Sequence, residues 1–201
     1  MAKKSGFFRK FFKLIFSLAG LALAILAIIL MTTPFVGQTV SGTVLGKEIA
    51  AAATLSGFAM AFGGEPVVSM TIDGESSNLV DLLPDEFGDA LKIEPNTGVM
   101  IAFILLAVGA LLALLYFLFS WGKKNVGLKK GLGLISVLAL VAGGVMAFFA
   151  PNFAEIETST EEILGFTMKS GLMYGGILTG VFAIAASILM AVATLLGPKS
   201  E

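Results

Sequence analysis

The side chains best suited to chemistry are carboxylates that gather in one acidic stretch. Asp81, Asp85, Glu86 and Asp89 stand close together in the sequence. Oxygen ligands of this kind suit Ca²⁺, and a converging pair of carboxylates can also exchange protons in an enzyme. The spacing of an EF-hand loop is missing, however. We therefore expect a solvated acidic surface, with calcium binding or acid–base catalysis as the alternatives.

The rest of the chain lacks the residue types and motifs that are most common in catalytic sites. It contains no cysteine and no histidine, which excludes disulfides, thiol nucleophiles, zinc sites of the usual type and histidine acid–base chemistry. The motifs of phosphate loops, serine hydrolases, zinc proteases and dinucleotide-binding folds are also absent from the sequence. We predict no catalytic residue, no cofactor and no metal site, and therefore a protein that is not an enzyme.

The composition is typical of a membrane protein. Of the 201 residues, 57% are hydrophobic and 13% are charged, against about 45–50% and about 25% in soluble domains. Four runs without charge, at 14–35, 98–121, 131–150 and 170–197, are long enough to cross a hydrocarbon core of about 30 Å. Because no Asp, Glu, Lys or Arg lies within these runs, an ion-coupled transporter or pump is disfavoured. We predict an all-α bundle of four transmembrane helices.

The segments that connect these runs differ in charge. Residues 1–13, 122–130 and 198–201 hold ten of the thirteen basic residues and one of the fourteen acidic ones. Cytoplasmic segments carry the excess of Lys and Arg. We therefore predict that both termini and the basic loop are cytoplasmic, whereas 36–97 and a short acidic loop at 151–169 lie outside. An outer segment without disulfides suits a bacterial plasma membrane better than an animal one.

The long outer segment predicts a small, partly β domain between the first two helices. Residues 38–44 and 66–72 are rich in β-branched side chains, and Asp73-Gly74 after the second run is a good turn signal. The uncharged stretch 49–64 is too short and too rich in glycine for a span, so we interpret it as a third strand or a short helix. Residues 75–93 read as turns and a short helix.

Three surfaces are candidates for contacts with partners. The first is the uncharged outer stretch, which either packs inside the outer domain or docks a partner or the lipid interface; its members are Leu55, Phe58, Met60 and Phe62. The second is a row of small residues in the last span, which packs within the bundle or against a second copy or another membrane protein: Gly171, Gly175, Thr179, Ala183, Ser187 and Ala191.

The third surface is an interleaved aromatic and basic run directly before the first span. It comprises Phe7, Phe8, Arg9, Lys10, Phe11, Phe12 and Lys13. On a helix, such residues place phenylalanines in the bilayer boundary and cations near anionic headgroups. We interpret the run as a membrane-surface anchor rather than a nucleic-acid site, because of its position beside a span.

The order of spans and loops resembles the claudin-like tetraspan architecture. The resemblance covers nearly the whole chain as a topology, but the claudin signature of Trp, Gly-Leu-Trp and two cysteines in the first outer loop is missing. The segment LSGFAMAFGG at 55–64 is also similar to a segment of small, uncharacterised four-span bacterial membrane proteins. Neither resemblance implies a functional residue.

The sequence thus favours a structural or interaction protein. We expect a non-enzymatic integral membrane protein that self-associates or serves as an accessory subunit of a larger envelope complex, with recognition through the outer domain. Its expected partners are the lipid bilayer and either itself or another membrane protein, without nucleic acid or an identified small-molecule substrate. The alternative is a component of a transporter or channel for lipid or other apolar solutes.

Overall fold

The computed structural model describes residues 2–44, 46–78, 93–120, 126–153, 159–163 and 166–196. The chain divides into two compact units. The first, here the helical unit, comprises Met1–Ile29, Ala102–Met146 and Leu178–Glu201. The second, here the sheet unit, comprises Leu30–Ile101 and Ala147–Ile177.

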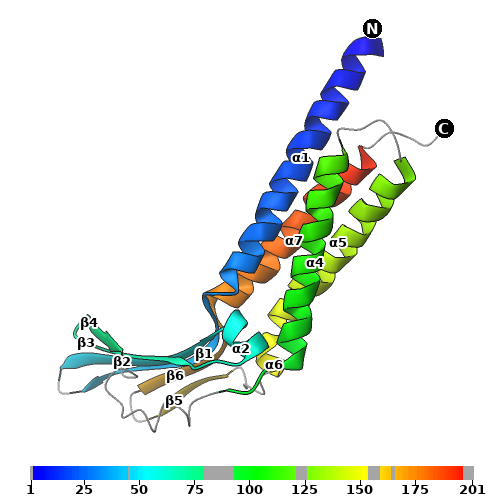
Figure 1. The fold of residues 1–201 in the computed structure, drawn as a ribbon. Coiled ribbons are helices and arrows are strands. Elements are labelled where there is room, and N and C mark those ends of the chain that lie inside the picture. The colour runs from blue at the N-terminus through cyan, green and yellow to red at the C-terminus, as the bar shows by residue number, and fades with distance from the viewer. Residues whose placement is uncertain are drawn as a thin grey trace. The chain divides into compact units, whose positions relative to one another are not determined.

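Four long helices supply the helical unit (Figure 1). They are α1 (Ala2–Leu30), α4 (Thr97–Phe119), α5 (Val126–Phe148) and α7 (Tyr174–Leu195). Each holds a stretch long and apolar enough to cross a membrane, and in α1 this stretch is Phe8–Leu30. The four apolar helices that the sequence predicts are therefore confirmed.

Several helix boundaries differ from the predicted ones. The helix α1 ends at Leu30 rather than near residue 35, because Pro34 has no N–H and disfavours helix at the residue before it. The Thr33 hydroxyl donates to the Leu30 carbonyl at 2.6 Å and satisfies one of the last helix carbonyls. At the other end of the chain, α7 begins at Tyr174, after a strand that occupies the start of the predicted fourth span.

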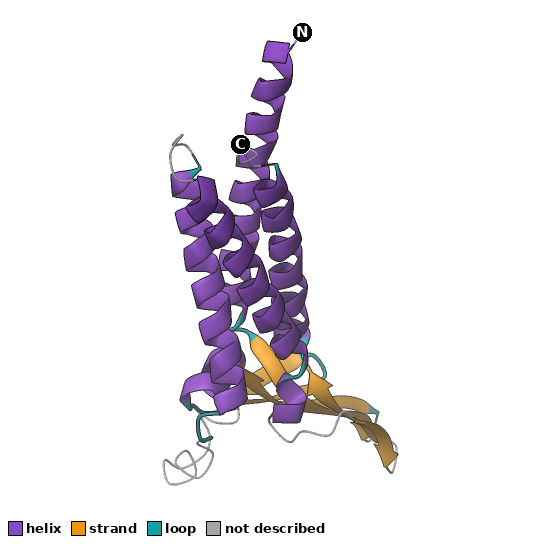
Figure 2. Ribbon diagram, turned by 90° about the vertical axis from the view of Figure 1, so that its right-hand side faces the viewer, coloured by secondary structure: helices purple, strands orange, loops and turns teal. Residues whose placement is uncertain are grey.

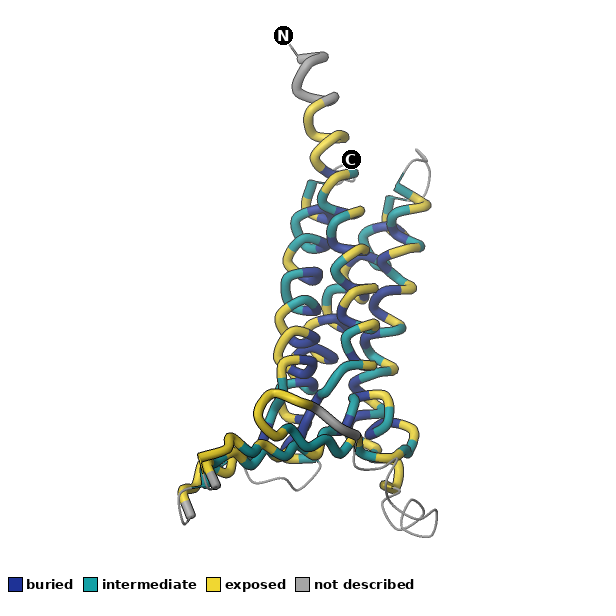
Figure 3. The backbone as a smooth tube through the Cα atoms, turned by 90° about the vertical axis from the view of Figure 1, so that its left-hand side faces the viewer, coloured by how far each residue is buried: buried dark blue, intermediate teal, exposed yellow. Residues whose placement is uncertain are grey.

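Small side chains make up much of the interior of the helical unit, beside a few large ones such as Leu106 and Leu140, while many large apolar ones point outward. Figure 3 shows buried positions recurring along the helices between exposed ones. Alanines dominate the buried positions: Ala24, Ala27, Ala102, Ala110, Ala113, Ala139, Ala183, Ala186 and Ala193. The exposed residues include Leu18, Ile25, Ile104, Leu111, Leu118, Leu134, Leu138, Val181 and Ile188. This pattern is typical of helices that pack closely in lipid.

The sheet unit contains one antiparallel sheet of six strands in the order β4-β3-β2-β1-β6-β5 (Figure 2). The strands are β1 (Pro34–Val44), β2 (Lys47–Ser56), β3 (Val67–Ile72), β4 (Glu75–Asn78), β5 (Ser159–Ile163) and β6 (Phe166–Leu172). The first four form a meander, and the hairpin β5–β6 joins it through pairing of β6 with β1. Two short helices, α2 (Gly57–Phe62) and α6 (Ala150–Phe153), complete the described elements.

The β prediction is confirmed in part and corrected in part. Strand β1 contains the predicted run 38–44, and β3 covers the predicted run 66–72 except for Pro66. The uncharged stretch 49–64 forms both a strand and a helix, β2 followed by α2. The prediction of a plain acidic loop at 151–169 is wrong, because β5 and the start of β6 lie there and extend the sheet. Of 75–93, the first four residues form β4, while 79–92 and the acidic side chains in that stretch lie outside the described residues.

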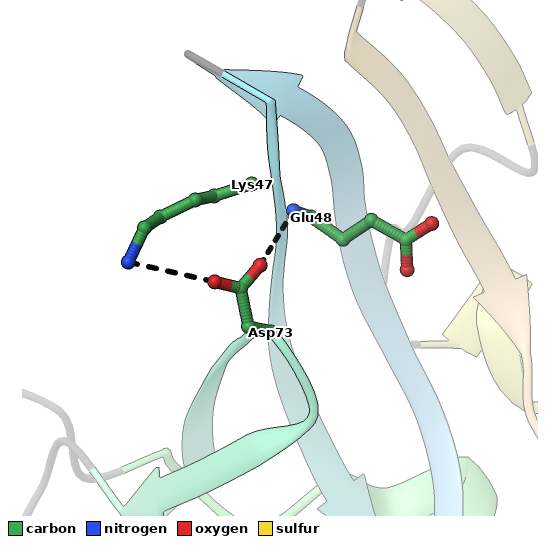
Figure 4. Close-up of polar contacts among 3 residues, drawn as sticks. All are labelled: Lys47, Glu48 and Asp73. Carbon is green, nitrogen blue, oxygen red and sulfur yellow. Dashed lines mark hydrogen bonds and ion pairs between the residues drawn. The ribbon is translucent and has the colours of Figure 1, made fainter.

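A tight turn joins β3 to β4. Asp73 (φ 51°) and Gly74 (φ 86°) both adopt positive φ, as a type I′ hairpin turn requires. The Asp73 carboxylate accepts a hydrogen bond from the Glu48 N–H at 3.1 Å and lies 3.5 Å from the Lys47 ammonium (Figure 4). Because the ion pair is exposed, we attribute the stability of this corner to the backbone geometry and the N–H contact.

Replacing Gly37 tests the close pairing at the centre of the sheet. A Cβ at this position in β1 would lie 2.5 Å from the Ala53 carbonyl oxygen of β2. We expect Gly37→Ala to destabilise the protein by about 1–3 kcal/mol and to lower its melting temperature in detergent. Gly131→Ala, a helical site with open space around it, is the matched control and should be neutral or slightly stabilising. Equal melting temperatures for the two variants would contradict the pairing.

Candidate functional site

The helix α2 is fixed at both ends and along its backbone. The Ser56 hydroxyl caps its N-terminus by accepting from the Ala59 N–H at 3.0 Å. The Phe58 N–H donates to the Met31 carbonyl at 2.8 Å, and the Met60 carbonyl accepts from the Asn96 N–H at 2.7 Å. Met31 directly follows α1 and Asn96 directly precedes α4, so α2 is hydrogen-bonded to the residues next to the ends of two apolar helices.

The structure divides the four residues of the predicted outer surface into two exposed and two buried ones. Phe58 and Phe62 are 49% and 44% exposed, and their ring centroids lie 4.8 Å apart. Leu55 and Met60 are buried, so their inclusion in an exposed surface is wrong. Within α2, residues four apart share one face whereas Met60 lies on the opposite one. Leu55 precedes the helix and is part of β2. The surface that the structure brings together is the Phe58–Phe62 pair.

The row of small residues in α7 is mostly buried. Gly175, Thr179, Ala183 and Ser187 are buried, whereas Ala191 is half-buried. Each step of four residues advances about 40° beyond a full turn, so the buried face drifts away from Ala191 to other positions near the helix end. Gly171 is not part of this helical face, because it lies in β6 opposite Gly37 of β1.

Within the helical unit, this row contacts helices of the same chain. A side chain on Gly144 of α5 would collide with the Cβ of Ala183. The Thr179 hydroxyl donates to the Ala27 carbonyl of α1 at 3.3 Å. These contacts agree with the interpretation of the row as packing within the bundle.

The basic and aromatic run before the first span is part of α1. Phe8, Arg9, Lys10, Phe11 and Phe12 are exposed, as an anchor at a membrane surface requires, and the side chain of Phe7 lies outside the described residues. The Arg9 Nε donates to the Leu196 carbonyl at 2.9 Å, at the end of α7.

Lys13 departs from the predicted anchor, because its side chain is only 8% exposed. Its ammonium lies 5.2 Å from the centroid of the Tyr116 ring of α4, a cation–π arrangement. Lys129, near the start of α5, is also buried, at 6% exposure, and is close enough to repel Lys13. Both lysines stand just before the uncharged runs at 14–35 and 131–150, but they lie within the longer apolar helices α1 and α5. Lysine is a good helix former, so α1 and α5 begin earlier than the uncharged runs do.

The buried tyrosine joins this cluster to the end of α7. The Tyr116 hydroxyl donates to the Ala193 carbonyl at 2.7 Å. Ala193 stands in the last turn of α7, where carbonyls lack partners within the helix. The Thr194 and Ser120 hydroxyls lie beside that of Tyr116, and the Ser120 Oγ is buried without a hydrogen bond of good geometry. We refer to Lys13, Tyr116, Ser120 and Lys129 as the lysine cluster.

A periodic signal in the sequence points to Lys13. The buried positions of α1 are Lys13, Ser17, Gly20, Leu21, Ala24 and Ala27, and Lys13 stands one turn before Ser17 on this face. The buried face of α1, which is mostly lined by small residues, therefore includes the lysine when it is continued one turn toward the N-terminus. No comparable pattern marks Lys129 or Ser120, whose burial depends on how α5 and α4 pack.

Comparison with known proteins adds no further evidence. No protein-family model, curated protein or solved structure matches this chain. The claudin-like resemblance therefore stays a prediction. Among the described residues, no group of three or more acidic side chains is placed to hold a metal ion.

Removing one hydroxyl tests the buried tyrosine. Tyr116→Phe keeps the ring beside Lys13 but leaves the Ala193 carbonyl without its donor. We expect a destabilisation of about 1 kcal/mol, seen as a lower melting temperature in detergent. Tyr174→Phe, at a site 55% exposed, is the control and should leave the melting temperature unchanged. Equal values for Tyr116→Phe and the unsubstituted protein would contradict a buried hydrogen bond.

Proposed function

We propose that the chain is an integral membrane protein with four spans, located in a bacterial plasma membrane with both termini on the cytoplasmic side. The arrangement of side chains in the helical unit supports insertion, because branched apolar residues face outward and alanines fill the interior. The orientation rests on the excess of basic residues at 1–13 and 122–130.

Within that membrane, we propose a non-enzymatic structural or interaction role, with recognition through the sheet unit. The observation that carries this proposal is the exposed Phe58–Phe62 pair. Its helix is hydrogen-bonded to Met31 and Asn96, which directly flank two candidate spans. A pair of aromatic rings held at this level suits either the lipid interface or an apolar surface of a neighbouring membrane protein. The neighbour is a second copy of this chain or another subunit of an envelope complex.

A second candidate is a component that handles lipid or other apolar solutes. The burial of Lys13 and Lys129 favours it, because ionisable side chains among membrane helices mark functional positions more often than structural ones.

Single cysteines test the orientation, since the chain has none of its own. Ser41→Cys lies at an exposed position of β1, and Gly127→Cys lies at an exposed position near the start of α5. We expect a membrane-impermeant maleimide to label the first in intact cells and the second only after permeabilisation. Labelling of both in intact cells, or the reverse order, would contradict the topology.

Photocrosslinking tests the interaction role. A photoreactive residue at Phe58 or Phe62 should capture a second copy or another membrane protein in cells, whereas the same residue at the buried Met60 should give crosslinks only within the chain. The products are identified by mass spectrometry. Crosslinks from Phe58 and Phe62 to lipid alone would contradict recognition through this pair and favour the lipid-handling alternative.

A further inference from the structure

The two faces of the six-stranded sheet differ in composition. Side chains alternate between the faces along each strand, and residues paired across neighbouring strands share a face. Val40 of β1 pairs with Ala51 of β2 and with Met168 of β6. The preceding residue, Thr39, pairs with Ala52 and lies on the opposite face. The register therefore assigns each paired strand residue to one of two faces.

One face is apolar and accessible. We refer to it as the apolar face; it is interrupted by the polar Gln38 and Ser170, and its apolar members include Val40, Ile49, Ala51, Ala53, Val68, Ile72, Phe166 and Met168. The opposite face is richer in hydroxyl and charged side chains: Thr39, Ser41, Thr54, Ser69, Thr71, Thr160, Glu162, Thr167 and Lys169. Met168 and Ile72 are 40% and 41% exposed. The chain therefore leaves apolar side chains of this face open to solvent.

The size of the apolar face suits a contact with another protein. A sheet is stabilised when its apolar face is buried against another layer, and a contiguous exposed apolar patch marks an interaction site. Strand β1 is paired with β6 over the seven residues 36–42, in a sheet of six strands. With about 3.4 Å per residue and about 4.8 Å between strands, the face covers about 500 Å². Two such faces together bury about 1,000 Å², the size at which specific protein contacts begin.

The charges on this side of the sheet favour a protein partner over lipid. Glu75 of β4 and Glu161 of β5 lie on the same side, one at each edge of the sheet. Lys47, at the start of β2, follows the same alternation but its ammonium lies 3.5 Å from the Asp73 carboxylate. Surfaces that bind a bilayer combine apolar side chains with Lys or Arg that attract anionic headgroups. A face with acidic edges does not provide this attraction.

We propose that the apolar face packs against the same face of a second copy of this chain. This contact rests on the self-association proposed above and is its surface in the sheet unit. A second copy offers an apolar face of equal size, and two such faces pack about 10 Å apart with interdigitating side chains. Ala51 and Ala53 form a low strip between Val40 of β1 and Val68 of β3, which can receive larger side chains of the other copy. The acidic edges stay in water at the rim of the contact.

Photocrosslinking between two differently tagged copies of the full chain in cells tests the contact. One copy carries a photoreactive residue at Val40 or Ala51, and capture of the other tag is measured. We expect several-fold more capture than from the same residue at Thr39 or Ala52. These two controls are half-buried, as Val40 and Ala51 are, and they differ in the face on which they lie.

A matched pair of charged substitutions tests the same contact with the photoreactive residue at Met168. Ala51→Glu places a carboxylate inside the contact, where it is costly to bury, and should lower capture of the second copy several-fold. Ala52→Glu, on the opposite face of the same strand, should leave capture unchanged. If Ala51→Glu does not fold, the comparison of the two faces by photocrosslinking decides.

Equal capture from the two faces would overturn the contact. Crosslinks from Val40 only to lipid, to another protein or within the same chain would overturn it as well, and they would identify the actual occupant of the face. If Phe58 and Phe62 still capture a second copy in that case, the proposed interaction role stands and the sheet contact alone is wrong.

Discussion

The absence of Cβ atoms at a few helix positions sets how closely the helices of the helical unit approach. A Cβ on Gly109 of α4 would lie 2.8 Å from the Leu140 side chain of α5, and one on Gly143 of α5 would lie 2.9 Å from the Leu106 side chain of α4. Each helix thus places a leucine against a glycine of the other. In lipid, where exposed leucine is not penalised, such close contacts and interhelical hydrogen bonds replace the hydrophobic effect as the source of association. The bond from the Ser136 hydroxyl to the Gly109 carbonyl, at 2.8 Å, depends on the same approach.

The sheet depends on a second close approach, where the chain leaves α1 and where it enters α7. The Met173 N–H donates to the Phe35 carbonyl at 2.8 Å, which continues the pairing of β6 with β1 to the last residue before α7. Gly175 lies against the backbone of Pro34, where any side chain would collide. Because β1 and β6 are distant in the sequence, their pairing closes a long loop and depends on these contacts rather than on local preference.

These two constraints explain which features the sequence predicts. Hydrophobic runs determine the four helices, and β-branched alternation determines β1 and β3, because both signals are local. The sequence Ser159–Ile163, STEEI, is polar and has no such signal; it becomes a strand through pairing with β6. The division of 57–62 into buried and exposed side chains follows from the short helix α2. A stretch of uncharged residues does not distinguish such a helix from a strand. The charge of Lys13 predicts a surface position, whereas its spacing from Ser17 places it on the buried face of α1.

The two buried lysines stand out against this packing. Elsewhere in the helical unit, buried polar positions are serines and threonines whose hydroxyls donate to carbonyls, as Ser17 does to Leu14 and Thr194 to Met190. Some of these hydroxyls bond within their own helix, whereas those of Ser136 and Thr179 bond to a neighbouring helix. A lysine differs from these residues because its ammonium group carries a full charge, whose removal from water costs more than that of a hydroxyl. For Lys13, the Tyr116 ring offsets part of this cost, because its π face attracts the ammonium group.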